Sequence, residues 1–192
     1  LMNLIKIVWN RAKGYKLLVA GSASGELVGA LRERGIDAWG VENNRYIHGK
    51  TPKALRKYNK FGSLTKLPFK AEEFDFVFET SLCHVPEKQV KRAVRELNRV
   101  VKTGFVFGSV TSDMMPGLID RYDLLRGVKK LGTWWEWSEL FFGNGFDLSM
   151  HRRDTTDAVW DATLKANKGP GDWYADADSL RYSFFDKIAD DD

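Results

Sequence analysis

The chain has 192 residues, of which 43% are hydrophobic and 29% are charged, and its formal net charge is +4 at pH 7. This length and composition indicate one globular domain with at most a small appendage, and they exclude a largely disordered chain. The single cysteine, Cys83, cannot form an intrachain disulfide, and no apolar run is long enough for a membrane-spanning helix. The excess of basic residues is too small to indicate nucleic-acid binding by itself. We expect a cytoplasmic protein.

Short apolar runs alternate with helical patterns along most of the chain. Residues 16–20 are apolar and precede a glycine, as in a strand buried on both faces, whereas residues 86–101 place their apolar side chains on one face of a helix. By these criteria we predict strands at residues 16–20, 37–42, 74–79, 103–110, 146–151 and 182–188. We predict helices at residues 24–34, 52–58, 86–101, 119–128, 138–142 and 154–167, and a turn or linker at 168–171. The alternation indicates an α/β fold with a mainly parallel sheet.

The clearest candidate site lies where the first two predicted strands end. The small residues of Gly21–Gly25 let the backbone approach a ligand, and the helix that follows offers unpaired N–H groups. Glu42 ends the second strand, where a carboxylate can accept hydrogen bonds from both hydroxyls of a ribose. The pair indicates a cofactor that contains adenosine. The alternative is that Glu42 only caps the segment after it.

Further motifs follow in order along the chain. They are GSLTKLPF at residues 62–69, FDFVF at 74–78, HVP at 84–86 and RELNRVVKTG at 95–104. Together with the turn and Glu42, this series resembles the class I S-adenosylmethionine (SAM) dependent methyltransferases, specifically the small-molecule group called methyltransferase type 11. The resemblance covers roughly Tyr15–Val110, and residues 137–148 are similar to a later W-x-x-L-x-x-x-x-G-F segment of that family.

The resemblance implies a Rossmann-like, doubly wound α/β sheet of seven strands, mostly parallel with an antiparallel last strand. It implies a SAM-binding domain at residues 14–152, with a helix or lid at 1–13 and an extension at 153–192 that packs on the same domain. SAM would be the cofactor and S-adenosylhomocysteine its product. The turn would face the methionine part of SAM and Glu42 the ribose. The implied cofactor-binding residues are Gly21, Ser22, Ala23, Gly25, Glu42, Asn43, Ser63, Leu64, Glu79 and Thr80.

Three positions depart from the family pattern. Val19 stands where the family has an acid at the end of the first strand, Ala23 replaces the middle glycine of the turn, and Ser63 replaces an acid that contacts adenine. An acid normally orients the amino group of SAM, and the loss of one charge-assisted hydrogen bond costs about 1.5–3 kcal/mol. These departures leave open a catalytically weak or inactive member that binds SAM or a partner.

Methyl transfer to a hydroxyl group requires a positioned acceptor, exclusion of water and removal of a proton. His84 is the candidate general base, and its alternative role is packing and hydrogen bonding. Asp113 ends the fifth predicted strand, where it either caps its loop or contacts substrate. The three histidines and the one cysteine lack the spacing of metal ligands, so we predict no metal site.

The expected acceptor is an oxygen or nitrogen of a small metabolite, such as a sugar or a biosynthetic intermediate. The basic run at Arg45–Lys60 is either a solvated helical face or a site for an anionic substrate. A dense aromatic cluster near residue 138 either packs in the core or a lid, or forms a pocket for the acceptor. Its members are Trp134, Trp135, Trp137, Phe141 and Phe142.

Two other functions fit the sequence less well. The G-x-G-x-x-G motif of nicotinamide-dependent oxidoreductases is interrupted by Ala23, and the pair Tyr46 and Lys50, which has the spacing of the short-chain dehydrogenase pair, follows the wrong strand. Enzymes that methylate amino groups of flipped bases use a D-P-P-Y type turn after the fourth strand, whereas residues 79–82 are Glu-Thr-Ser-Leu. We expect neither nucleic acid nor membrane as a partner.

Overall fold

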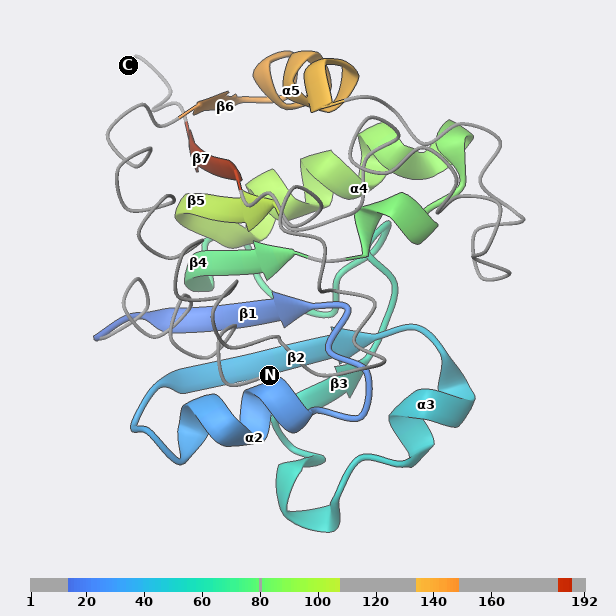
Figure 1. The fold of residues 1–192 in the computed structure, drawn as a ribbon, viewed down its shortest axis with the longest axis vertical. Coiled ribbons are helices and arrows are strands. Elements are labelled where there is room, and N and C mark those ends of the chain that lie inside the picture. The colour runs from blue at the N-terminus through green and yellow to red at the C-terminus, as the bar shows by residue number, and fades with distance from the viewer. Residues whose placement is uncertain (1–13, 80, 108–133, 149–182, 188–192) are drawn as a thin grey trace, which may run out of the picture.

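The computed structural model describes residues 14–79, 81–107, 134–148 and 183–187, which form an α/β sheet with helices on both faces (Figure 1). The strand order is β3-β2-β1-β4-β5-β7-β6; β7 is antiparallel to both of its neighbours, and the other described pairs are parallel. The prediction of a Rossmann-like α/β fold with a parallel sheet is confirmed. The strands are β1 (Lys16–Ala20), β2 (Asp37–Glu42), β3 (Asn59–Phe61), β4 (Phe74–Glu79), β5 (Val101–Phe107), β6 (Phe146–Leu148) and β7 (Ser183–Lys187).

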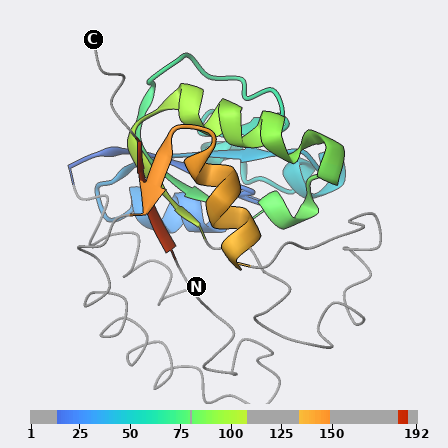
Figure 2. The same ribbon diagram turned by 90° about the horizontal axis from the view of Figure 1, so that it is seen from above.

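The helices divide the core between the two faces of the sheet, and Figure 2 shows α2 and α4 on opposite sides. On one face, α2 buries Leu27, Val28 and Leu31 against β1 and β4. On the other face, the apolar stripe of α4 packs with residues of α5. The helices are α2 (Glu26–Arg32), α3 (Arg45–Gly49), α4 (Glu87–Val100) and α5 (Trp134–Phe142), with two 3₁₀ turns, η1 (Lys53–Leu55) and η2 (Leu82–His84).

The segment between β2 and β3 differs from the sequence prediction. The predicted helix at 52–58 is wrong: only η1 forms, and the chain then turns so that the Gly40 N–H donates to the Tyr58 carbonyl at 2.8 Å. A helix absent from the prediction, α3, forms because the Asn44 side chain accepts hydrogen bonds from the Tyr46 and Ile47 N–H groups. The short strand β3 was not predicted either, because three residues carry too little periodicity.

The remaining predicted elements differ at their ends or lie outside the described residues. β5 begins two residues before the predicted strand, and α5 begins four residues before the predicted helix. Part of the predicted strand at 146–151 is present as β6, and β7 lies within the predicted strand at 182–188. The predictions outside the described residues are the helix or lid at 1–13, the helices at 119–128 and 154–167, and the turn at 168–171.

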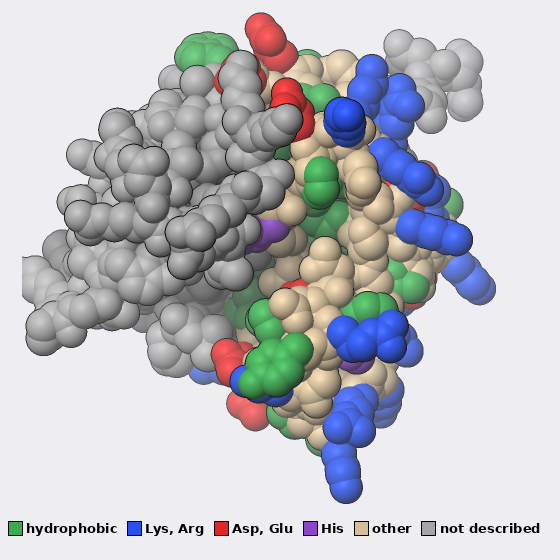
Figure 3. All heavy atoms as spheres, turned by 90° about the vertical axis from the view of Figure 1, so that its right-hand side faces the viewer, with side chains coloured by type: hydrophobic (Ala, Val, Ile, Leu, Met, Phe, Trp, Pro, Cys, Tyr) green, Lys and Arg blue, Asp and Glu red, His purple; other side chains and the backbone are tan. Residues whose placement is uncertain are grey.

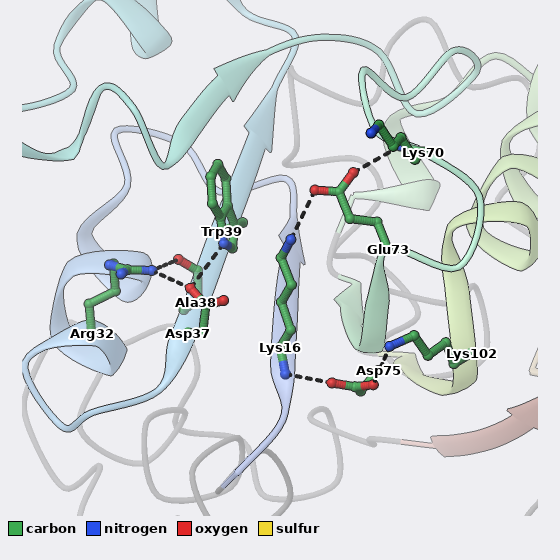
Figure 4. Close-up of polar contacts among 9 residues, drawn as sticks. All are labelled: Lys16, Arg32, Asp37, Ala38, Trp39, Lys70, Glu73, Asp75 and Lys102. Carbon is green, nitrogen blue, oxygen red and sulfur yellow. Dashed lines mark hydrogen bonds and ion pairs between the residues drawn. The ribbon is translucent and has the colours of Figure 1, made fainter.

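Charged side chains pair with one another at the amino ends of the strands (Figure 4). Asp75 accepts hydrogen bonds from the Lys16 main-chain N–H at 2.8 Å and from the Lys102 ammonium at 3.0 Å. The Lys16 ammonium in turn pairs with Glu73 at 3.0 Å. On the next strand Asp37 pairs with Arg32 at 2.8 Å. These bonds tie β1, β4 and β5 together at the amino ends of the strands, and separately tie β2 to α2.

None of the helices in the described part of the chain combines the length and the apolar character that crossing a bilayer requires.

Candidate functional site

The turn between β1 and α2 folds over the end of β2. The N–H groups of Gly21 and Ser22 both donate to the Val41 carbonyl, at 3.0 and 3.1 Å. Gly21 and Gly25 have φ angles of 81° and 86°, which glycine adopts without strain. The bonds to the Val41 carbonyl hold the backbone of the turn at the carboxyl ends of the strands (the carboxyl edge of the sheet), at the right of Figure 1, where α3 also lies.

Ala23 has a left-handed backbone in this turn, with φ of 50°. This is the position at which the family has a glycine, and a side chain in this conformation costs of order 1–3 kcal/mol. The chain thus retains the backbone shape of a glycine turn despite the alanine. The replacement of the family's glycine by Ala23 therefore strains the backbone but does not change the shape of the turn.

The carboxylate of Glu42 bridges two segments at the same edge. Its Oε2 atom accepts the Ala23 N–H at 3.0 Å, and its Oε1 atom accepts the Asn44 N–H at 2.6 Å. The side chain is half-buried, and a carboxylate has about four lone-pair positions, so capacity for further donors remains. The contact with Asn44 is the cap that the alternative interpretation requires, whereas the contact with Ala23 joins Glu42 to the glycine turn.

Asn59 is the residue of this site that the sequence analysis missed. It is fully buried in β3, and its side chain holds the turn from beneath. The amide oxygen accepts the Ser22 hydroxyl at 2.5 Å, and the amide nitrogen donates to the Ala23 carbonyl at 3.1 Å and to the Thr51 hydroxyl at 2.9 Å. The sequence around Asn59, Tyr58-Asn59-Lys60, carries no local signal of this role, because asparagine is depleted in strands and its partners lie elsewhere in the chain.

Two glycines leave room for this amide. A Cβ atom on Gly25 would come within 3.1 Å of the Asn59 amide nitrogen, and a Cβ atom on Gly40 would come within 2.6 Å of the Ser22 hydroxyl. Gly40 lies in the middle of β2, where glycine otherwise weakens a strand. A glycine is needed at position 40 because the turn and Asn59 pack too closely against this residue for a side chain to fit.

The other predicted contacts are distributed along the same edge. Glu79, which ends β4, is fully buried and accepts hydrogen bonds from the Ser81 and Leu82 N–H groups, so it holds η2 in place. The Ser63 hydroxyl lies 2.9 Å from the Thr65 hydroxyl in a turn of its own, and Leu64 is buried in the core. Asn43 is exposed. Thr80 and Asp113 lie outside the described residues.

His84 is the last residue of η2 and is exposed at the surface. Its pKa is lowered because neighbouring atoms displace part of its hydration, while the Glu42 carboxylate acts in the opposite direction. The lowered pKa keeps this imidazole neutral at pH 7 and able to accept a proton.

The aromatic cluster of α5 is divided between the core and the surface. Trp137 and Phe141 are buried, and their rings stack at 5.9 Å, whereas Trp135 is 70% exposed and Phe142 41% exposed. The side chain of Trp134 lies outside the described residues. Core packing therefore accounts for the two buried rings.

No group of three or more histidine, cysteine, aspartate or glutamate side chains in the described ranges is arranged to hold a metal ion.

Comparison with known proteins agrees with this geometry. Residues 18–107 match a family model described as a methyltransferase domain, of the type 11 group. The resemblance to the type 11 methyltransferases is confirmed. The match to these methyltransferases supports SAM as the cofactor. No curated protein sequence matches the chain.

Solved methyltransferase structures share the fold at low sequence identity. A SAM-dependent methyltransferase from Thermotoga maritima has a TM-score of 0.60 at 21% identity, covering 76% of this chain and 70% of its own. One from Mesorhizobium loti has a TM-score of 0.65 at 16% identity, covering 95% and 94%. Magnesium protoporphyrin IX methyltransferase from Synechocystis, solved with bound S-adenosylhomocysteine, has a TM-score of 0.60 at 15% identity, covering 77% and 72%. At these identities the likeness concerns the fold alone.

Proposed function

We propose that this chain is a SAM-dependent methyltransferase that transfers a methyl group to an oxygen or nitrogen of a small metabolite in the cytoplasm. The observation that carries the proposal is the position of the Glu42 carboxylate, bonded to the Ala23 N–H of the glycine turn at the carboxyl edge. This is the juxtaposition of an acid and a tight turn that an adenosine-containing cofactor requires.

The residues present fit SAM on two sides. Glu42 offers oxygen acceptors for the ribose hydroxyls, and the turn at residues 21–25 brings its backbone close beside that carboxylate. Asn43, Ser63 and Leu64 would border the adenine, and Glu79 and Thr80 the sulfonium. When bound, SAM supplies the electrophilic methyl group. The domain would extend over residues 14–152, with residues 1–13 as a lid and 153–192 packed on the same domain.

His84 would accept the proton of a hydroxyl acceptor. Its lowered pKa supports this role, because a base must be unprotonated at the working pH. We expect His84→Gln to lower kcat by about 10²-fold or more while the SAM affinity stays unchanged, since general bases contribute about 10²–10⁴-fold. His48→Gln is the control, because His48 contacts the Asn59 carbonyl at 2.9 Å. Full activity in His84→Gln would exclude the role as base.

Calorimetric titration with SAM and with S-adenosylhomocysteine tests cofactor binding. We expect Glu42→Ala to weaken binding at least tenfold, since it removes charge-assisted hydrogen bonds worth about 1.5–3 kcal/mol. Asp37→Ala is the matched control, because Asp37 is a carboxylate at the opposite end of the same strand. Equal affinities of the two variants would refute the ribose contact. No binding of either ligand by the unaltered protein near millimolar concentration would refute the whole proposal.

A second candidate is a methyltransferase-fold module that binds SAM without transferring methyl. The observation in its favour is the altered first motif, with Val19 in place of an acid and a strained Ala23. A mass-spectrometric screen of metabolite extracts distinguishes the two candidates. A metabolite that gains one methyl group supports the enzyme, whereas binding without any turnover supports the module.

A further inference from the structure

Charge is strongly segregated in the segment between Glu42 and Glu72. Residues 43–71 contain no aspartate or glutamate and eight basic side chains, although the whole chain has a net charge of only +4. The rest of the chain therefore has a net charge of −4. The basic residues are Arg45, Lys50, Lys53, Arg56, Lys57, Lys60, Lys66 and Lys70. We call these residues the basic segment.

The cations of the basic segment are accessible, and Lys70 lies beside the carboxylate of Glu73. All are exposed except Lys60, which is half-buried. The four ion pairs in the described part of the chain involve none of their side chains. Figure 3 shows lysine and arginine side chains gathered along one side of the face that carries the carboxyl edge. Like charges that lie close together repel one another and create a positive electrostatic potential at the surface. An anionic partner bound there would lower this repulsion.

Exposed aromatic rings lie among these cations. Tyr46 is 73% exposed and Phe61 45% exposed, and a cation lies near each ring: the Lys50 ammonium is 4.3 Å from the Tyr46 ring centre, and the Arg45 guanidinium is 5.0 Å from that of Phe61. A ring beside a cation can stack on an unpaired base while the cation contacts the flanking phosphate.

The size and composition of the basic segment indicate the class of partner. Its cations are spread over α3, η1, β3 and the loops between and after them, so a small anion would leave most of them unpaired. Six of the eight are lysines, and lysine is depleted at protein–protein interfaces but suited to phosphate contacts. The exposed rings favour a partner that has bases over a polyanion without them, because aromatic side chains stack on unpaired bases.

In contrast to the expectation from the sequence that no nucleic acid is a partner, we propose that the basic segment binds single-stranded RNA, with Tyr46 and Phe61 stacking on bases and the lysines contacting phosphates. The surface adjoins Glu42 at the end of β2. Glu79, at the end of β4, lies two strands away, and this separation corresponds to about 10 Å across the sheet. It thus lies on the ribose side of the proposed cofactor site. The inference rests on charge and exposure, and it holds whether or not the chain transfers methyl groups.

Fluorescence anisotropy with a labelled 12-nucleotide oligouridine tests the proposal without any cofactor. We expect the triple variant Lys50→Glu, Lys53→Glu, Lys57→Glu to lower the affinity at least tenfold at 150 mM salt, and to reduce the slope of log affinity against log salt by about 2. The control is Lys88→Glu, Lys91→Glu, Arg92→Glu on α4, three exposed cations with the same total change of charge. We expect this control to lose less than about threefold, because salt screens distant charges. An equal loss in the two triple variants would overturn the proposal.

The contribution of stacking is tested separately. We expect Tyr46→Ala to weaken oligouridine binding about fivefold or more with an unchanged salt slope, since stacking is worth about 1–3 kcal/mol per base. Tyr15→Ala, at a ring that is 50% exposed outside the basic segment, should have no effect. Heparin and vesicles with 30% phosphatidylserine serve as anions without bases. Binding to either that matches oligouridine, or no effect of Tyr46→Ala, would overturn RNA as the partner. If the charge-reversed variant fails to fold, Lys→Gln at the same positions replaces it.

Discussion

The two edges of the sheet use charge in opposite ways. At the amino edge, Asp75 accepts the Lys16 N–H and pairs with Lys102, and the Lys16 ammonium pairs with Glu73 (Figure 4). At the carboxyl edge, Glu42 accepts main-chain N–H groups instead of a cation, and the part of the basic segment on α3 lies beside it. Ion pairs stabilise the fold, whereas a carboxylate that accepts only main-chain N–H groups keeps lone pairs with which it can bind a ligand.

This difference separates the expected effects of mutation. Substitutions at the amino edge should lower the free energy of unfolding and leave ligand affinity unchanged. Substitutions of Glu42 should act mainly on ligand affinity. Asn59 is the exception, because it is buried beneath the turn and belongs to both the core and the site.

We expect the largest effect from Asn59→Ala. It removes the amide that bonds to Ser22, Ala23 and Thr51, and leaves buried polar groups unsatisfied at about 1–3 kcal/mol each. The free energy of unfolding should fall by about 3 kcal/mol, measured by urea denaturation, and SAM affinity should fall with it. Asn98→Ala is the control, since the Asn98 amide bonds to the Asn144 and Gly145 carbonyls. It should lower stability alone, and a matching loss of SAM affinity there would contradict the link between Asn59 and the site.

A smaller effect is expected from Asp75→Ala at the amino edge. Burial opposes ionisation of this carboxyl, but the Lys16 N–H and the Lys102 ammonium outweigh it, so the pKa is lowered. A lowered pKa stabilises the fold above the ordinary value near 4, and this contribution is lost as the pH falls through the native value. At pH 7 we expect a loss of about 1–2 kcal/mol and, between pH 5 and 2, a shallower fall of stability than in the unaltered protein. An unchanged acid profile would show that Asp75 does not contribute.

The smallest effect concerns the backbone of the turn. Ala23→Gly should raise the free energy of unfolding by up to about 1 kcal/mol, because glycine adopts a positive φ without strain but is more flexible when unfolded. Glu72→Gly is the matched control, since Glu72 has a φ of 51° outside the site. Both variants should gain stability in thermal unfolding, but only Ala23→Gly should alter SAM affinity. A change of affinity in Glu72→Gly would indicate a general rather than a local effect.

Much of this arrangement could be predicted from the sequence. Three elements were predicted from their apolar patterns: the runs at residues 16–20 and 74–79, and the apolar stripe of α4. Each pattern could be read on its own because burial of an element sets the spacing of its apolar residues. The turn at Gly21–Gly25 and Glu42 was placed at one edge because parallel strands align their carboxyl ends. The segment from α3 to β3 was mispredicted, since its short elements depend on a cap at Asn44 and on pairing with β2.

The sequence by itself determined the α/β alternation, the tight turn and the acid that ends β2, because each is a local property of a few consecutive residues. Only the tertiary structure decided that Asn59 supports the turn, that Glu42 bonds to Ala23, and that the rings of α5 divide between core and surface. These contacts join residues that lie far apart in sequence or on different faces of one helix. Their energies depend on which groups are brought together and dehydrated, and the order of the residues does not contain that information.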